Sequence, residues 1–105
     1  MDKVFGLLGL ARRAGKVICG EKPSKDAVKF GRACVVVIAS DASENTKKNI
    51  TDSCRYYNIP YYIYGTKDEL GHAVGNEFNA CVTVSDVGFA NSIEKCLQAN
   101  INGGD

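Results

Sequence analysis

The stretch Ala33-Cys-Val-Val-Val-Ile-Ala39 decides the fold class. It is an unbroken apolar run with β-branched residues at its centre, which is typical of a central strand buried on both faces of its sheet. A strand buried in this way needs a layer of helices on each side. The run is also the longest clean apolar stretch in the chain, and it falls far short of the roughly 18 residues that a membrane-spanning helix needs.

Upstream of this run the chain alternates helix and strand patterns. Apolar residues recurring at i, i+3, i+4 and i+7 predict an amphipathic helix over residues 2–14. Residues 17–19 are typical of a short strand. A second helix is expected to begin with Pro23 at its first helical position, where proline is well tolerated, and to end at Gly31.

Downstream, two segments are typical of capping boxes, in which a polar side chain caps a helix and a glutamate three residues later bonds back to it. These segments are Asp41-Ala-Ser-Glu44 and Thr66-Lys-Asp-Glu69. The first predicts Asp41 as the cap of a helix that turns Tyr57 inward and stops before Pro60. The second predicts a short helix that ends near Gly75.

Two further strands are expected at residues 61–64 and 80–84, and an apolar stripe over residues 89–97 predicts a last helix. The order of these elements predicts an α/β domain with a small sheet of about four strands and helices on both faces. We expect a single domain over residues 1–99, followed by a disordered tail over residues 100–105.

The composition is that of an ordinary globular protein, with 105 residues, 45% hydrophobic and 24% charged. Arg12 and Arg13 follow the first apolar stretch instead of preceding it, unlike the charges of a secretory signal, so we expect a cytoplasmic protein without a membrane segment. Five cysteines at wide spacings contain no Cys-x-x-Cys pair. We therefore expect no metal site and interpret the cysteines as core residues.

The net charge of +1 conceals an uneven distribution. Eight of the 13 Lys and Arg residues, but only three of the 12 acids, fall within the first 32 residues, which therefore carry +5 against −4 for the remainder. A basic third can concentrate an anionic ligand on one face of the protein. The alternative is a set of solvated helix faces that are rich in lysine.

No motif supports catalysis. His72 is the only histidine and is expected on a short helix, while Asp68 and Glu69 are consecutive and better explained as favourable charges in a first helical turn. There is no glycine-rich nucleotide-binding motif. We therefore expect no enzyme activity and no cofactor.

The informative segment is Gly20-Glu-Lys-Pro-Ser-Lys-Asp26. It follows a strand and opens a helix, whose N-terminus presents unpaired N–H groups and a partial positive charge. A glycine lets another backbone come close, and Lys22 and Lys25 add mobile cations. The segment is either an anion site or an ordinary turn between a strand and a helix, and its pattern does not favour one over the other.

The chain resembles a bacterial member of the kink-turn RNA-binding ribosomal protein superfamily, which contains ribosomal proteins L-seven-Ae and L-thirty-e. The segments that carry the resemblance, in order, are Leu8–Lys16, Gly20–Asp26, Val36–Ala42, Ile59–Tyr61 and Thr66–Gly75. The resemblance implies a three-layer α/β/α sandwich around a mixed sheet. It also implies a protein without catalytic activity that binds structured RNA, expected to be ribosomal RNA with a kink-turn.

The resemblance and the basic residues together predict an RNA-binding surface. Its expected residues are Arg12, Arg13, Lys16, Gly20, Glu21, Lys22, Pro23, Lys25, Lys67, Asn76, Glu77, Phe78 and Asn79. Gly20 would allow the RNA backbone to approach, Lys22 would face the sheared G·A pairs and Lys67 would contact a phosphate. Phe78 would stack on an unpaired base, unless it belongs to the core.

Two residues depart from the pattern of the superfamily. Pro23 stands where glutamate or glutamine is usual, and Asp26 stands where many members carry lysine. These departures favour an alternative of another class, a protein-interaction adaptor of the same fold that has lost RNA binding. A third interpretation is a nucleotide-binding α/β domain that uses residues 20–25 as an anion loop.

Overall fold

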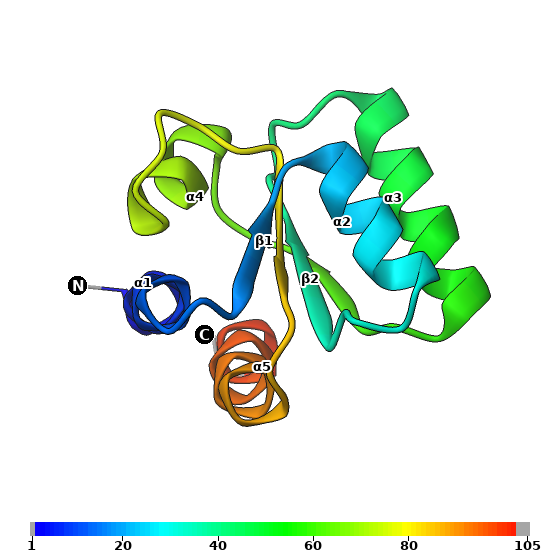
Figure 1. Cartoon of the computed structure of the whole chain (residues 1–105). Helices are drawn as coiled ribbons and strands as arrows, with labels where there is room; N and C mark the ends of the chain where they lie inside the picture. Colours follow the sequence, from blue (N-terminus) through cyan, green and yellow to red (C-terminus); the bar gives the residue numbers. More distant parts are fainter. Residues whose placement is uncertain (1, 103–105) are drawn as a thin grey trace.

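The computed structural model describes residues 2–102, and Figure 1 shows the arrangement of their helices and strands. The elements follow one another as α1 (Lys3–Arg13), β1 (Val17–Cys19), α2 (Glu21–Lys29), β2 (Val35–Ile38), α3 (Glu44–Tyr57), β3 (Tyr61–Ile63), α4 (Lys67–Ala73), β4 (Cys81–Val84) and α5 (Val87–Asn102). The expected alternation of helices and strands is confirmed.

The four strands form one mixed sheet in the order β1-β4-β2-β3. β4 is antiparallel to both of its neighbours, while β2 and β3 are parallel. All residues of the two central strands, β2 and β4, are buried. It follows that β1, β2 and β3 all point the same way, so the segments that leave their carboxyl ends meet at one edge of the sheet.

Helices cover both faces of this sheet. Figure 1 shows α2 and α3 on one side, where they pack against each other, and α1, α4 and α5 on the other, where α1 contacts both partners. The three-layer α/β/α sandwich predicted from the sequence is confirmed.

Two of the predicted helix starts are wrong in detail. Ser43, not Asp41, caps α3, because its hydroxyl accepts a hydrogen bond from the Thr46 N–H at 3.1 Å. The Asp41 carboxylate instead accepts the Lys67 N–H at 2.8 Å. Helix α2 begins two residues before Pro23, which is its third residue.

The capping box at the start of α4 is confirmed, since Thr66 and Glu69 bond reciprocally to each other's backbone N–H groups. Tyr57, expected to point inward, is 38% exposed, and α3 ends at Asn58 in the left-handed conformation. Helix α5 extends to Asn102, so the first three residues of the predicted tail are helical. Residues 103–105 lie outside the described residues.

The cysteines behave as small apolar side chains. All five are free thiols, and Cys54 and Cys81 are fully buried. Burial raises the pKa of each of these two thiols to about 11, which keeps them protonated near neutral pH.

Within residues 2–102 no cluster of three or more His, Cys, Asp or Glu side chains is placed to hold a metal ion. None of the helices described there is long and apolar enough to cross a membrane.

Candidate nucleic-acid interface

The turn between β1 and α2 depends on a backbone conformation that only glycine adopts readily. Gly20 has φ of 100° and ψ of 161°. Its N–H donates to the Cys81 carbonyl at 3.1 Å, and its own carbonyl accepts the Ser24 N–H at 3.1 Å. The turn is thereby fastened to β4 on one side and to the first turn of α2 on the other.

The N-terminus of α2 has no side-chain cap. Side chains cap the other helices, and these caps are Asp2 for α1, Ser43 for α3, Thr66 for α4 and Asp86 for α5. At α2 the N–H groups of Glu21 and Lys22 have no acceptor in the part of the chain that the structure describes. Pro23 has no N–H at all. Two backbone donors therefore remain open at the positive end of this helix.

The Glu21 side chain, although next to these donors, is already engaged with α3. Its carboxylate accepts a hydrogen bond from the Thr46 hydroxyl at 2.9 Å and a longer one from the Asn49 amide at 3.4 Å. The sequence did not single out Thr46 or Asn49. Glu21 therefore fastens the start of α2 to α3, which leaves little of the carboxylate free for a ligand.

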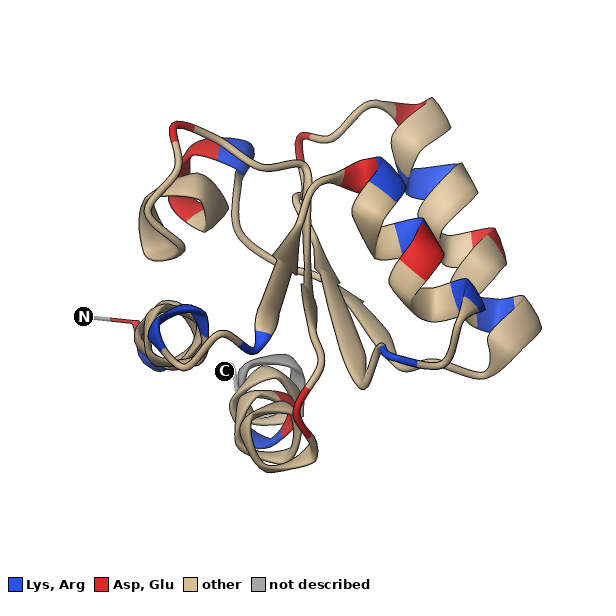
Figure 2. Ribbon diagram, viewed as in Figure 1, with Lys and Arg blue, Asp and Glu red and all other residues tan. Residues whose placement is uncertain are grey.

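Lys22 and Lys25 project from the exposed side of the same turn. They line a shallow hollow of about 430 Å³ together with Glu21 and Asp26. The Lys22 ammonium lies 3.7 Å from the Asp26 carboxylate, while the Lys22 side chain is 87% exposed. Figure 2 shows basic and acidic residues side by side along α2, so the surface is mixed in charge and not uniformly basic.

The second expected element, the loop from residue 76 to 79, packs closely on α4. A Cβ atom on Gly71 would lie 2.3 Å from the Phe78 Cα, so only glycine permits this contact. The Phe78 ring is 61% exposed, which excludes the alternative that it belongs to the core. The Lys67 ammonium lies 5.9 Å from the centre of that ring.

Asn79 and Asn76 hold the loop in place. Asn79 is buried, and its backbone N–H donates to the Lys67 carbonyl at 3.0 Å. The Asn76 N–H donates to the Gly71 carbonyl at 2.8 Å, and its side chain lies near the Cys19 thiol. Burial raises the pKa of that thiol. These contacts make Asn79 a support for the loop, whereas the exposed Glu77 and Phe78 form its outer surface.

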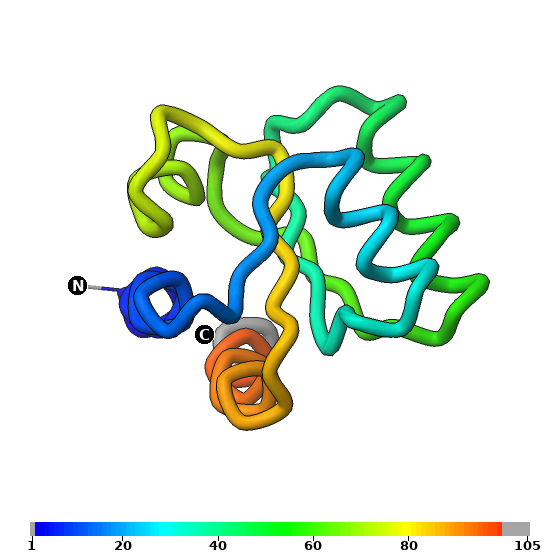
Figure 3. Tube along the Cα trace, in the orientation of Figure 1, coloured from blue at the N-terminus to red at the C-terminus, as the bar shows by residue number. Residues whose placement is uncertain are grey.

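The turn and the loop come together because of the sheet topology. β1 ends at the same edge of the sheet at which β4 begins, and the Gly20–Cys81 hydrogen bond joins the two. Figure 3 shows the segment that leads into β4 passing beside the start of α2. Ligands of open α/β sheets commonly bind at the carboxyl ends of the strands, where this surface lies.

Three further basic residues of the expected set lie on or just after α1, and of these only Arg12 comes near the turn, close to the Cys19 thiol. Lys16 precedes β1 and is therefore at the opposite edge of the sheet, where its carbonyl accepts the Ser85 N–H at 2.9 Å. The Arg12 guanidinium donates to the Val74 carbonyl at 3.2 Å, which ties α1 to the end of α4. Arg13 lines a groove between α1 and α4. The structure does not bring Lys16 or Arg13 to the turn.

Comparison with known proteins gives consistent matches over most of the chain. The family described as "Ribosomal protein L7Ae/L30e/S12e/Gadd45 family" matches residues 2–94. The "RNA-binding protein YlxQ" of Bacillus subtilis is 44% identical over 93 residues, which cover 89% of this chain and 93% of the relative.

Solved structures agree with these sequence matches. A protein of unknown function from Bacillus halodurans has a TM-score of 0.91 at 35% identity, and the match covers 93% of this chain and 99% of that one. The 15.5 kD RNA-binding protein of Giardia lamblia has a TM-score of 0.79 over 91% of this chain and 85% of that one. At 19% identity it shows a shared fold only.

Proposed function

Because the chain belongs to the ribosomal protein L7Ae/L30e/S12e/Gadd45 family, we propose that it is an RNA-binding protein without catalytic activity. Its ligand is structured RNA, in the first place ribosomal RNA with a kink-turn, in the cytoplasm. The single observation that carries this proposal is the open N-terminus of α2, where two backbone donors beside two exposed lysines have no acceptor among residues 2–102. The name of the Bacillus subtilis relative, an RNA-binding protein, supports it.

The chemistry of the turn suits an RNA backbone. Phosphate oxygens accept hydrogen bonds from backbone N–H groups at a helix start, and the positive end of the helix dipole favours their charge. Gly20 adds no side chain that would keep the RNA away. Lys22 and Lys25 then supply phosphate contacts, or a donor to guanine O6 or N7 where a base edge comes within reach.

The loop offers a second and different kind of contact. Phe78 presents an exposed ring next to Lys67, a combination suited to stacking on an unpaired base whose phosphate the lysine contacts. Pro23 has no side-chain hydrogen-bonding group. Reading of G·A pairs therefore falls to Lys22 and the open backbone donors, and base discrimination is expected to depend on few contacts.

The test is a titration of the protein against a labelled kink-turn RNA and a matched straight duplex, each at two salt concentrations. We expect tighter binding to the kink-turn and a steep loss of affinity for both RNAs at the higher salt. Equal affinity for the two RNAs would mean that the protein does not recognise the kink-turn and that its ligand is another RNA structure. No binding to either RNA at low salt would overturn the proposal in favour of the adaptor.

The contribution of the loop is tested with Phe78→Ala. Loss of a stacked base should weaken kink-turn binding by about 1–3 kcal/mol. Phe30→Ala is the matched control, because Phe30 is 66% exposed but lies at the other end of α2. If the two substitutions change RNA affinity equally, the loop does not contact the RNA.

A further inference from the structure

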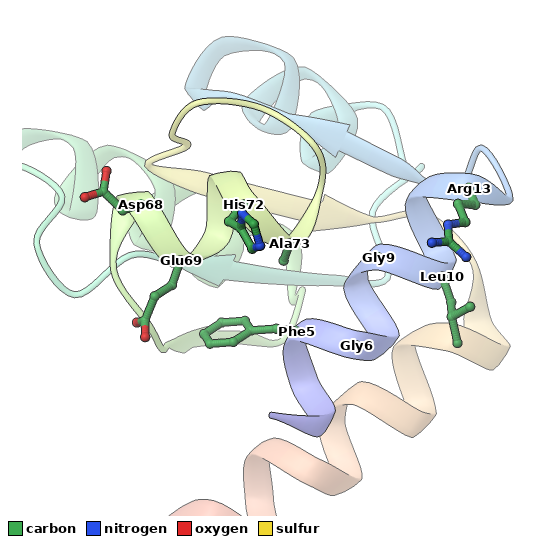
Figure 4. A pocket seen from close by; sticks show the side chains of 9 residues that line it. All are labelled: Phe5, Gly6, Gly9, Leu10, Arg13, Asp68, Glu69, His72 and Ala73. Carbon is green, nitrogen blue, oxygen red and sulfur yellow. The ribbon is translucent and has the colours of Figure 1, made fainter. Parts of the chain in front are cut away.

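Helices α1 and α4 leave between them an open groove of about 520 Å³ that the proposed RNA surface does not use (Figure 4). We call it the α1–α4 groove. Its lining residues are Phe5, Gly6, Gly9, Leu10, Arg13, Asp68, Glu69, His72 and Ala73. The helices approach each other closely at Gly9, where an added Cβ would lie 3.1 Å from the Ala73 carbonyl oxygen.

The floor of the groove is apolar and lacks large side chains. Gly6, Gly9 and Ala73 contribute no side chain beyond a methyl group, whereas Phe5 and Leu10 flank them. Leu10 is 52% exposed, so an apolar side chain of a ligand can reach it from the groove. Glycine inside a helix costs stability relative to alanine, so α1 accepts two destabilising residues along this face.

Opposite charges mark the two ends of the groove. Figure 4 shows Glu69 beside Phe5 at one end, with Asp68 further out, and Arg13 above Leu10 at the other. Neither the Arg13 side chain nor the Asp68 side chain has a hydrogen bond or ion pair with any other described residue. One Glu69 oxygen accepts the Thr66 N–H at 3.0 Å. The groove is thus polarised, and charges at both ends are available to a ligand.

We propose that the α1–α4 groove docks a short segment of a partner protein. The segment carries an apolar side chain that enters between Phe5 and Leu10, a lysine or arginine beside Asp68 and Glu69, and an aspartate or glutamate beside Arg13. RNA fits this groove poorly, because its phosphates would face two carboxylates. A second copy of the chain is the alternative occupant, and it would be seen as a dimer that depends on Leu10.

The length of the groove sets the size of the segment. Phe5 and Arg13 are eight residues apart on α1, which corresponds to roughly 12 Å along the helix axis. About four residues of extended chain, or two turns of a helix, span that distance.

The position of α4 allows the groove and the RNA surface to be occupied together. Lys67 and Gly71 contact the Phe78 loop, whereas Glu69 and His72 line the groove. The docking itself does not depend on RNA binding, so the two proposals can fail separately.

The probe for the test is a display library of random 12-residue peptides, selected on the immobilised full-length protein. We expect enriched peptides to carry an apolar residue with a basic residue on one side and an acidic residue on the other. Their affinity should fall at least tenfold for Leu10→Asp. It should not change for Ile63→Asp, a control because Ile63 is 46% exposed on β3 and does not line the groove. Circular dichroism establishes that both variants are folded.

A charge exchange tests the orientation. Arg13→Glu should weaken the selected peptides about tenfold, and replacing the acid of the peptide by lysine should restore their affinity. Three results would overturn the proposal. One is a selection in which no peptide depends on Leu10. Another is a dimer in solution that Leu10→Asp dissociates. The third is a loss of RNA binding in Leu10→Asp but not in Ile63→Asp.

Discussion

Helices α2 and α4 both begin at the carboxyl edge of the sheet, but their first turns are built in opposite ways. At α4 the side chains of Thr66, Glu69 and Asp41 satisfy backbone N–H groups of the first turn. At α2 no described residue accepts the backbone N–H groups of Glu21 and Lys22. Donors that already have an acceptor within the protein are not available to a ligand. The start of α4 therefore stabilises the fold, whereas the start of α2 can bind a ligand.

The largest loss of stability is expected from a substitution in α4, where the helix packs against the Phe78 loop. Gly71→Ala places a Cβ 2.3 Å from the Phe78 Cα, and the loop backbone must move to make room. Urea unfolding should show a loss of about 3 kcal/mol, at the upper end of the usual cost of overpacking. Gly88→Ala is the milder comparison, because its Cβ meets no backbone and only the Asp86 side-chain oxygen that caps α5, at 3.2 Å. Equal stabilities of the two variants would contradict the close packing.

Gly20→Ala tests the start of α2 by straining the backbone of the turn that precedes it. Alanine must adopt φ near 100° and ψ near 161°, and we expect the strain to reduce the free energy of unfolding by about 2 kcal/mol. Gly15→Ala is the matched control, because Gly15 has φ of 74° and no atom within 4 Å of an added Cβ. The left-handed conformation should cost that variant only about 1 kcal/mol. The reverse order of the two losses would contradict this account of Gly20.

Lys22→Ala tests the open turn as a binding site without altering its backbone. RNA affinity should fall by roughly 1–3 kcal/mol, with less discrimination between RNAs, if Lys22 reads a base. Lys95→Ala removes the same charge from α5 on the opposite face of the sheet, and it should change affinity far less. Affinity and discrimination that both remain unchanged in Lys22→Ala would remove Lys22 from the site.

Thr66→Ala removes the cap of α4 and sharpens the distinction between the two turns. Stability should fall by about 1 kcal/mol, and Thr66→Ser should restore most of it. RNA affinity of the folded protein should stay within about twofold, since we assign no RNA contact to this cap. A loss of RNA affinity as large as that of Lys22→Ala would mean that the two helix starts do not differ in function.

The smallest expected effect is a gain. Asp26→Asn removes the carboxylate 3.7 Å from the Lys22 ammonium, which frees the lysine and reduces repulsion of phosphate. RNA affinity should rise by about 0.5 kcal/mol, since exposed ion pairs are weak. Asp52→Asn on α3, where the carboxylate lies 3.0 Å from Lys48, removes the same charge from another pair. If both variants gain the same RNA affinity, the gain comes from the change in net charge and not from the release of Lys22.

Sequence patterns that depend on neighbouring residues were predictive. The β-branched run became a fully buried central strand, and the Thr66–Glu69 box formed with both of its hydrogen bonds. Both signals arise from burial and bonding within a few residues. The resemblance of the chain to a known family additionally predicted the order of the layers, and it predicted that the turn and the loop belong to one RNA-binding surface.

Errors occurred where residues distant in the sequence compete for the same groups. Asp41 was predicted to cap its own helix, but it bonds to the start of α4 and leaves Ser43 as the cap. The bonds from two α3 side chains to the Glu21 carboxylate were equally invisible in the sequence, and the expected contact of Glu21 with RNA stays a prediction. Lys16 precedes a strand whose direction only the sheet topology reveals. No local pattern carries that information.

The position of β4 between β1 and β2 has a consequence for how the protein is made. The chain emerges during translation from its N-terminus, so β1 and the lysines of α2 are synthesised long before residues 81–84. Until Cys81 appears, β1 lacks its partner strand and the Gly20 N–H lacks its acceptor. A nascent chain that stops short of Cys81 therefore carries the cations of the turn without the backbone geometry that presents them.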